Sequence, residues 1–500
     1  MQFEQLDDCS IHHEVVPHRA ATNTGGNILH TTTISRPRRL FGVGIVSVSL
    51  LLASCGGDDD AEPAQTTAPA PATESATEPD PEPISTEAPA PTEPTSTEAP
   101  ASTEPPTTDP AGPTGSPVIV AALTDQSGPS AGTQKDAPEI LNAWAGFINA
   151  NGGVNGHPVV IEVRDTKGDP ATAQSALDEL VAMNPGLLYI ADSTSESSLA
   201  AGIEASGIPL VGVGYNPAVW GGNIEAFKLA CSPDEGAPVA CALTNAFTIT
   251  TTFGAVVDEQ VIAAQLAGAT KLATAACAEV DSCSAAAPVF DATAAALGIE
   301  NAGVTKVSST APDYTAECIK WVQDGIDFIQ ISASGEMGAR LYSDCTDQGY
   351  DGLFGASAGT VGGALIKVDG IHLVGGLNAF PWWVDDAPVA EFRDAMNAAG
   401  VAEDAWSNPN ATGTWSVMQL WAKGMSNTDI TADDEITKEA SLAAMYTISD
   451  ETLDGLISPV TFTEGERASH RPCFWPYELK DGVFTALNGG LKYSCNPPEA

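Results

Sequence analysis

The apolar and polar residues of the chain predict a strand, a helix and a second strand between residues 116 and 163. Residues 116–123 form a continuous β-branched and apolar run, which is typical of a strand buried on both faces of a parallel sheet. Apolar residues between positions 140 and 148 share one helical face, and Gly152-Gly153 end that helix. Residues 157–163 then form the second strand. These segments predict a βαβ unit with a right-handed crossover.

The same alternation continues along the chain and predicts an α/β fold. The remaining strands are expected at residues 186–191, 208–213, 271–276, 304–308, 326–331 and 353–356, and the helices at 171–183, 253–266, 286–297, 314–323 and 336–348. They fall into two successive α/β series of similar size. Two such series predict two lobes with a cleft between them, and a cleft of this kind is a common place for a small-molecule site.

The loop after the first predicted strand is a candidate binding site. In parallel sheets, ligands bind outside the carboxyl ends of the strands. The loop of residues 126–130 leaves such an end, and it contains Gln126 and Ser127. We therefore expect these two residues to face a ligand.

The N-terminal segment has the features of a lipoprotein signal. Residues 40–52 form an apolar run that has the length of a signal-peptide core and is too short to span a bilayer comfortably. Residues 52–55 (LASC) resemble a lipobox, where bacteria attach diacylglycerol to a cysteine. Residues 1–54 are therefore predicted to be a leader, and Cys55 the lipidated residue. The alternative is a membrane anchor with an incidental cysteine.

The segment that follows is predicted to be an unfolded tether. Residues 55–115 are mostly Ala, Pro, Thr, Ser, Glu and Asp, a composition that cannot bury enough apolar surface to fold. Its prolines favour an extended, semi-stiff chain. The whole sequence has 65 acidic and only 20 basic residues, which argues against a nucleic-acid partner. A high negative charge instead favours solubility of an exported protein.

Cysteine usage agrees with export. Besides Cys9 and Cys55 there are eight cysteines, which allow 105 pairings. The simplest pairing is sequential: Cys231 with Cys241, Cys277 with Cys283, Cys318 with Cys345, and Cys473 with Cys495. The alternatives are metal ligation or a reactive thiol, although the sequence has no C-x-x-C motif.

One motif is typical of an enzyme. Gly355-Ala356-Ser357-Ala358-Gly359 matches the G-x-S-x-G nucleophile elbow and follows a predicted strand. Only His372 and His470 could complete a triad, and neither fits the order of a hydrolase. The chain carries no zincin, phosphate-loop or dinucleotide motif. We therefore expect no enzymatic activity and no metal or cofactor, and a serine hydrolase that uses Ser357 is a remote alternative.

Several short motifs, in order, resemble type I solute-binding proteins, the family of the Leu/Ile/Val-binding proteins of ABC importers. They are SGP at 127–129, INANGGVNG at 148–156, DTKGDP at 165–170, DYT at 313–315, GIDF at 325–328, EMG at 336–338, GIHLV at 370–374 and TWS at 414–416. The resemblance covers residues 116–420. It implies two Rossmann-like lobes joined by a hinge of three crossings, which close on a small polar solute and dock on ABC permease subunits. We assign residues 116–230 and 376–458 to lobe 1, and 231–375 and 459–500 to lobe 2.

The resemblance also indicates ligand-binding positions. In the first lobe it implies that hydroxyls and N–H groups after the third strand hold a ligand carboxylate. It also implies that backbone and hydroxyl groups after the fourth strand contact the ligand. The alternative role for the serines after the third strand is helix capping. In the second lobe, Ser334 and Ser357 follow predicted strands and are further candidates for ligand binding. With the loop after the first strand, the expected ligand-binding residues are Gln126, Ser127, Ser193, Thr194, Ser195, Gly214, Tyr215, Asn216, Ser334 and Ser357.

The second lobe departs from the family pattern. Amino acid binders place a glutamate, which pairs with the ligand ammonium, where this chain has Ala356 and Ser357, and one cleft tyrosine corresponds to Ala333. A buried ammonium without a partner is costly, so we expect a carboxylate, an amide or a flat aromatic solute. Residues 380–383 (FPWW) could form an aromatic wall or pack in the hinge. We expect a lipid-anchored receptor on the outer face of the cell membrane; the alternative is a sensory or scaffold lipoprotein without a permease.

Overall fold

The computed structural model describes residues 112–129, 131–213, 217–220, 243–249, 253–279, 283, 287–465, 469–470 and 473–495. All of them belong to one compact unit, Ala101–Ala500. Within these residues, no helix combines the length and apolar character needed to cross a membrane. The predicted leader, Cys55 and the tether up to residue 111 lie outside the described residues.

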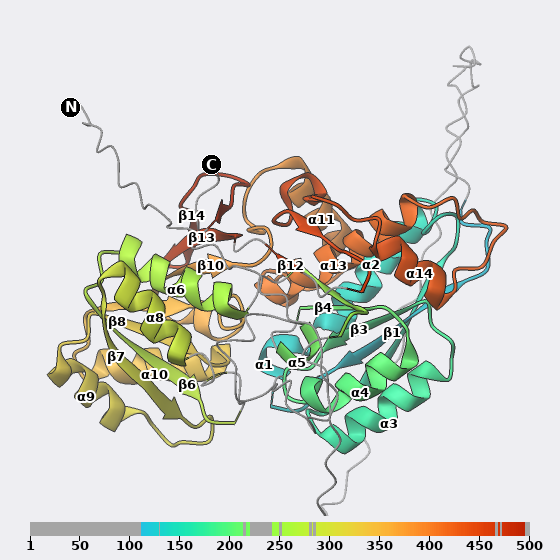
Figure 1. Ribbon diagram of the computed structural model, residues 1–500. Helices are drawn as coiled ribbons and strands as arrows, with labels where there is room; N and C mark the ends of the chain where they lie inside the picture. Colours follow the sequence, from blue (N-terminus) through green and yellow to red (C-terminus); the bar gives the residue numbers. More distant parts are fainter. Residues whose placement is uncertain are drawn as a thin grey trace, which may run out of the picture. The chain divides into compact units, whose positions relative to one another are not determined.

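The first sheet has five parallel strands in the order β2-β1-β3-β4-β5 (Figure 1). The strands are β1 Val118–Thr124, β2 Val159–Asp165, β3 Leu187–Ala191, β4 Leu210–Gly212 and β5 Ala246–Thr248. β1 pairs with β2 on one side and with β3 on the other. Helix α2 (Ala137–Ala150) connects β1 to β2, which confirms the predicted βαβ unit.

The second sheet repeats this order and then adds antiparallel strands. Its parallel part runs β7-β6-β8-β9-β10, and β13 and β14 extend it beyond β10. The strands are β6 Lys271–Cys277, β7 Glu300–Val307, β8 Phe328–Ser332, β9 Leu353–Ala356, β10 His372–Leu377, β13 Cys473–Lys480 and β14 Val483–Ala486, and β15 Ser494–Cys495 pairs with β13. The predicted parallel strands are confirmed, whereas the antiparallel ones were not predicted.

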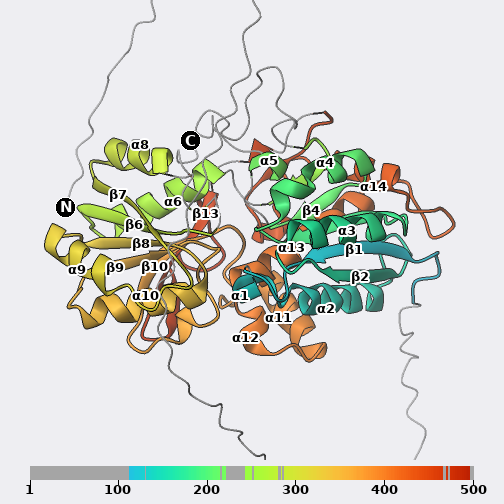
Figure 2. The ribbon, with the colours of Figure 1, turned by 90° about the horizontal axis from the view of Figure 1, so that it is seen from below.

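Helices cover both faces of each sheet (Figures 1 and 2). On the first sheet, α3 (Pro170–Val181), α4 (Glu196–Ser206) and α5 (Pro217–Trp220) share one apolar core, and α2, α11 (Ala387–Ala398) and α13 (Pro409–Ser426) pack on the other face. On the second sheet, α6 (Phe253–Leu266) and α8 (Ala287–Leu297) share one core, and α9 (Thr315–Asp324) and α10 (Gly335–Asp347) pack opposite. The other segments are α1 Ala131–Gln134, α12 Glu403–Trp406, α14 Lys438–Met445, the 3₁₀ turns Leu365–Lys367 and Leu453–Gly455, β11 Val460–Thr461 and β12 Ser469–His470.

The chain passes between the two sheets three times: after β5, after β10 and before β13. This connectivity confirms the two-lobe α/β fold with three crossings. One boundary differs from the expectation, because β5 pairs with β4 in the first sheet, whereas a boundary at residue 231 assigned it to lobe 2. The three residues of β5 stand in a polar, threonine-rich stretch, TNAFTITTT at 244–252, so no continuous apolar run identified this strand. The other lobe boundaries stay a prediction.

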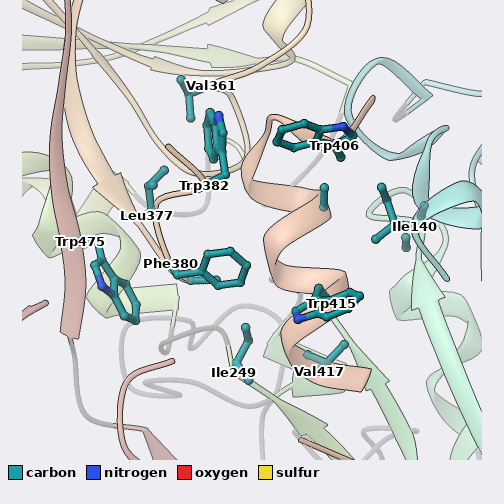
Figure 3. Packing of buried hydrophobic residues seen from close by; sticks show 14 of the residues in the cluster. Ile140, Ile249, Val361, Leu377, Phe380, Trp382, Trp406, Trp415, Val417 and Trp475 are labelled. Carbon is teal, nitrogen blue, oxygen red and sulfur yellow. The ribbon is translucent and has the colours of Figure 1, made fainter. Parts of the chain in front are cut away.

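Aromatic side chains fill the region where β10 leads into the first lobe (Figure 3). Phe380 is fully buried, and its ring centroid lies 5.3 Å from that of Phe392, which lies 5.5 Å from that of Trp415 on α13. Trp382 is buried, and Trp383 stacks on Phe484 at 4.5 Å. Residues 380–383 therefore pack in the hinge, which favours the second of the two roles considered for them.

Three of the four predicted disulfides are present, and all involve elements of the second sheet or its helices. Cys277 pairs with Cys283, Cys318 with Cys345, and Cys473 with Cys495. Cys231 and Cys241 lie outside the described residues. The described residues contain no group of three His, Cys, Asp or Glu side chains that could hold a metal ion.

Candidate functional site

The strand order places most of the predicted site residues at two switch points. In a 2-1-3-4-5 sheet, the crevice for ligands lies between strands 1 and 3, because the connections diverge there. In the first sheet, Gln126 and Ser127 follow β1, and the 193–195 loop (Ser193, Thr194 and Ser195) follows β3. In the second sheet, the corresponding loops follow β6 and β8, and Ser334 lies after β8. Ser357 follows the next strand, β9.

Gln126 and Ser127 are held by a carboxylate at the end of β2. The Asp165 Oδ1 atom accepts the Gln126 N–H at 3.0 Å, and Oδ2 accepts the Ser127 hydroxyl at 2.7 Å. Burial raises the pKa of Asp165, but hydrogen bonds from Ser127, Gln126 and Lys167 outweigh it and leave this pKa below its ordinary value. The polar groups of this loop thus stabilise its own conformation, and whether they also contact a ligand stays a prediction.

The 193–195 loop contains buried polar atoms without partners. The Asp192 Oδ1 atom accepts the N–H groups of Thr194 and Ser195, both at 3.0 Å. Asp192 and Ser195 are fully buried, yet Asp192 Oδ2 and Ser195 Oγ have no hydrogen-bond partner among the described residues. Ser195 precedes α4, but its side chain makes no capping bond. The capping role considered for Ser195 is therefore not observed, and ligand contact by its hydroxyl stays a prediction.

A glutamine that the sequence analysis missed contacts this loop. Gln134 ends the short helix α1 and is only 4 % exposed. Its Nε2 group donates to Ser193 Oγ at 2.8 Å, and its Oε1 atom accepts the Ser193 N–H at 3.2 Å. The available signal was its position, since it lies in the polar segment between β1 and α2, which leaves the carboxyl edge of the sheet.

The predicted serines of the second lobe are satisfied locally. The Ser334 hydroxyl caps α10 by accepting the Met337 N–H at 3.3 Å. Ser357 is 9 % exposed, and its Oγ atom lies 3.2 Å from Thr360 Oγ1, which in turn donates to the Ile331 carbonyl. No hydrogen bond among the described residues joins either serine to the 193–195 loop. Gly214, Tyr215 and Asn216 lie outside the described residues.

The surroundings of Ser357 lack the geometry of a nucleophile elbow. An elbow joins a strand directly to a helix. Here β9 is followed by turns, and the next helical residues are the 3₁₀ turn Leu365–Lys367. His372 Nε2 lies 2.8 Å from Glu478 Oε1. Among the described residues, the hydrogen-bond partner of Ser357 is Thr360 and not His372. The G-x-S-x-G match is therefore incidental.

A polar pocket of about 420 Å³ lies between segments of the two lobes. The first lobe contributes Gly132, Lys135, Asp136, Glu139, Ala402, Asp404, Ala405, Asn408 and Asn410, and the second contributes Glu336, Val361, Gly362, Gly363, Ala364 and Lys367. The Lys367 Nζ and Asp404 Oδ2 atoms form an ion pair at 3.0 Å. Burial is the main cause that raises the pKa of Asp136. None of the residues predicted from the sequence lines this pocket.

Comparison with known structures finds the same fold in solute-binding proteins. A fatty acid ABC transporter substrate-binding protein from Thermomonospora curvata is 17 % identical, with a TM-score of 0.59 over 75 % of this chain and 93 % of that chain. Solute-binding proteins of R. palustris in complex with benzoate and with 4-hydroxybenzoate are 16 % and 15 % identical, with TM-scores of 0.58 and 0.57. Each alignment covers 74 % of this chain and 95 % of the other. No curated protein sequence matches the chain.

A sequence model of one protein family matches most of the folded region. The family is described as periplasmic binding protein, and the match covers residues 117–483. This range includes the parallel strands of both sheets, the three crossings and both switch points. Members of the family bind solutes outside the cytoplasm and are not enzymes, in agreement with the surroundings of Ser357. The chain therefore belongs to the periplasmic binding protein family, as a solute-binding protein of the type I fold.

Proposed function

We propose that this chain binds a small, flat organic acid at the carboxyl edges of its two sheets, with the carboxylate held by the 193–195 loop. The observation that carries the proposal is the fully buried Ser195 hydroxyl without a partner. An unsatisfied buried hydroxyl costs about 1–3 kcal/mol, and a ligand acceptor removes that cost. The Ser193 and Ser195 hydroxyls can donate to a carboxylate, whereas the N–H groups of the loop already donate to Asp192 and Gln134.

The residues at the strand ends of the second lobe favour an organic acid over an amino acid as the ligand. Ala333 and Ala356 are buried at the ends of β8 and β9, where a ligand ammonium would need a carboxylate. Glu279, after β6, already accepts hydrogen bonds from Ser308 and Ser309. Those bonds outweigh the desolvation that raises its pKa and leave this pKa below its ordinary value. Glu279 is thus a carboxylate occupied by the protein itself.

The solutes of the structural neighbours belong to the same chemical class. Benzoate and 4-hydroxybenzoate are flat carboxylates, and a fatty acid is a carboxylate with an apolar body. The solutes of these proteins support the proposed solute class for this chain. An aromatic or apolar body would lie against Ala333 and Ala356.

We propose further that the chain works as a lipid-anchored receptor. Cys55 would carry the lipid, residues 55–115 would hold the folded unit away from the membrane, and the liganded lobes would deliver the solute to ABC permease subunits. The order of apolar run, LASC motif and proline-rich segment in the sequence supports this arrangement. Mass spectrometry of the protein from its native membrane tests it, since cleavage before Cys55 with an added diacylglycerol is the expected result.

Calorimetric titration of the full chain tests the solute class. Benzoate and 4-hydroxybenzoate should bind, and Ser195→Ala should weaken their binding about tenfold, because one hydrogen bond to a charged ligand is lost. Ser175→Ala, at an exposed position of α3, is the matched control and should leave the affinity unchanged. Binding of leucine or valine in preference to these acids would refute the proposed class.

A further inference from the structure

We infer that Gln134 is a built-in competitor for the ligand carboxylate, and that it sets which acids the chain accepts. This inference rests on the proposed function. It concerns a residue outside the motifs of the family resemblance, and it follows from three features of the structure: the geometry of the Gln134–Ser193 pair, the burial of Gln134, and the position of helix α1 between the lobes.

The Gln134 amide makes the bonds that a ligand carboxylate would make. Its Oε1 atom accepts the Ser193 N–H at 3.2 Å, and its Nε2 group donates to Ser193 Oγ at 2.8 Å. A carboxylate has the same planar shape and accepts from an N–H and, after rotation of the hydroxyl, from Ser193 Oγ–H. The amide head group therefore occupies the place of a ligand head group at Ser193.

The pair is sheltered from water, which strengthens the competition. Gln134 is 4 % exposed, so its amide cannot replace its hydrogen bonds to Ser193 with hydrogen bonds to water unless the side chain moves. The next hydroxyl of the loop, on Ser195, has no partner. Of the Ser193 and Ser195 hydroxyls, one is thus engaged by the protein and one is left open, and a carboxylate that takes both must displace the Gln134 amide.

Helix α1 connects this displacement to the second lobe. Gly132, in the same short helix, lies against the Glu336 side chain of α10, where a Cβ atom at position 132 would collide with the carboxylate. α1 therefore contacts the first lobe through Gln134 and the second lobe through Gly132. Acids that displace Gln134 and leave α1 in place are favoured, and this selects small head groups.

Calorimetric titration of the full chain with benzoate, for wild type and three variants, tests the inference. Gln134→Ala removes the competitor and should tighten benzoate binding about fivefold, since the ligand no longer breaks two neutral hydrogen bonds. Gln134→Glu places a like charge beside the carboxylate and should weaken binding at least tenfold. Gln323→Ala, at an exposed position of α9, is the matched control and should change nothing.

The outcomes separate this inference from the function on which it rests. If wild type binds benzoate, Ser195→Ala weakens it and Gln134→Ala fails to tighten it, only the inference is overturned. If neither wild type nor Gln134→Ala binds benzoate or 4-hydroxybenzoate, both proposals fail. Circular dichroism at the titration temperature confirms folding, and Gln134→Asn, whose amide is too short to reach Ser193, should reproduce the effect of alanine.

Discussion

The two lobes share a strand order but are stabilised by different means. The second lobe carries all three disulfides found among the described residues, on β6, between α9 and α10, and between β13 and β15. In its described residues, the first lobe depends on packing, with Trp415 of α13 buried against Phe147 and Phe392. One topology can thus be held by covalent links or by aromatic packing.

The predicted serines of the two lobes differ in their hydrogen bonding. At strand ends of the second lobe, Ser334 and Ser357 have partners within the lobe. In the first lobe, Ser195 Oγ and Asp192 Oδ2 are buried without partners. Buried unsatisfied groups reduce stability and are typical of functional sites. Thr274 Oγ1 and Gln330 Oε1 of the second lobe are buried without partners too, so the lobes differ at the predicted serines and not in polar satisfaction as a whole.

The largest expected effect comes from breaking the aromatic packing of the first lobe. Trp415→Ala should lower the free energy of unfolding by about 3–5 kcal/mol, because a large side chain leaves a cavity among aromatic neighbours. Urea unfolding followed by circular dichroism measures the change. Leu266→Ala, at a position that is 65 % exposed on α6, is the control and should stay within about 0.5 kcal/mol of wild type. A small effect of Trp415→Ala would contradict a first lobe held by packing.

Removing the disulfides of the second lobe should come next. The Cys318–Cys345 bridge spans 27 residues and the Cys277–Cys283 bridge only 6. Loop-closure entropy predicts a loss of about 3–4 kcal/mol for the paired Ala variant of the first, and about 2 kcal/mol for that of the second.

Denaturant unfolding of both double variants measures this ratio. Each serves as control for the other, since both remove two buried or partly buried sulfurs. Equal losses, or losses below about 1 kcal/mol, would mean that the second lobe, too, is held mainly by packing.

Ser195→Ala should have the opposite sign. Because the hydroxyl is buried without a partner, its removal should raise the free energy of unfolding of the ligand-free protein by about 1 kcal/mol. Thermal unfolding without ligand measures this gain. A loss of stability would show that the hydroxyl is satisfied in solution and would weaken the contrast between the lobes.

The smallest effect concerns Asp165, whose hydrogen bonds with Ser127 and Gln126 hold the pKa below the ordinary 3.8 despite the opposing effect of desolvation. A lowered folded-state pKa contributes stability that is present above 3.8 and is lost as the pH falls through the folded-state value.

Asp165→Asn should therefore cost about a few tenths of a kcal/mol at pH 7, because a partly exposed carboxylate is screened, and less at pH 2, which lies below the ordinary 3.8. Urea unfolding at both pH values measures the difference, and the exposed Asp347→Asn is the control. A cost at pH 2 as large as the cost at pH 7 would rule out the carboxylate bonds as its source.

The sequence by itself determined the parallel part of the fold and much of the covalent framework. Apolar runs such as 118–124 are long enough to identify buried strands, whereas the order of the strands in each sheet came from the structure. Disulfides between near neighbours, such as Cys277 and Cys283, follow from spacing. The predicted positions of Gln126 and Ser193 at a sheet edge also follow, since parallel strands end together.

Only the tertiary structure decided which polar groups are satisfied. Hydrogen bonds such as those of Asp165 to Ser127 and of Gln134 to Ser193 join residues 38 and 59 positions apart, and no local pattern encodes such partners. The three-residue strand β5 and the antiparallel β13 likewise depend on neighbours that are distant in the chain. Periodicity reports which side of an element is buried, whereas the partner of a buried polar atom is set by packing between elements.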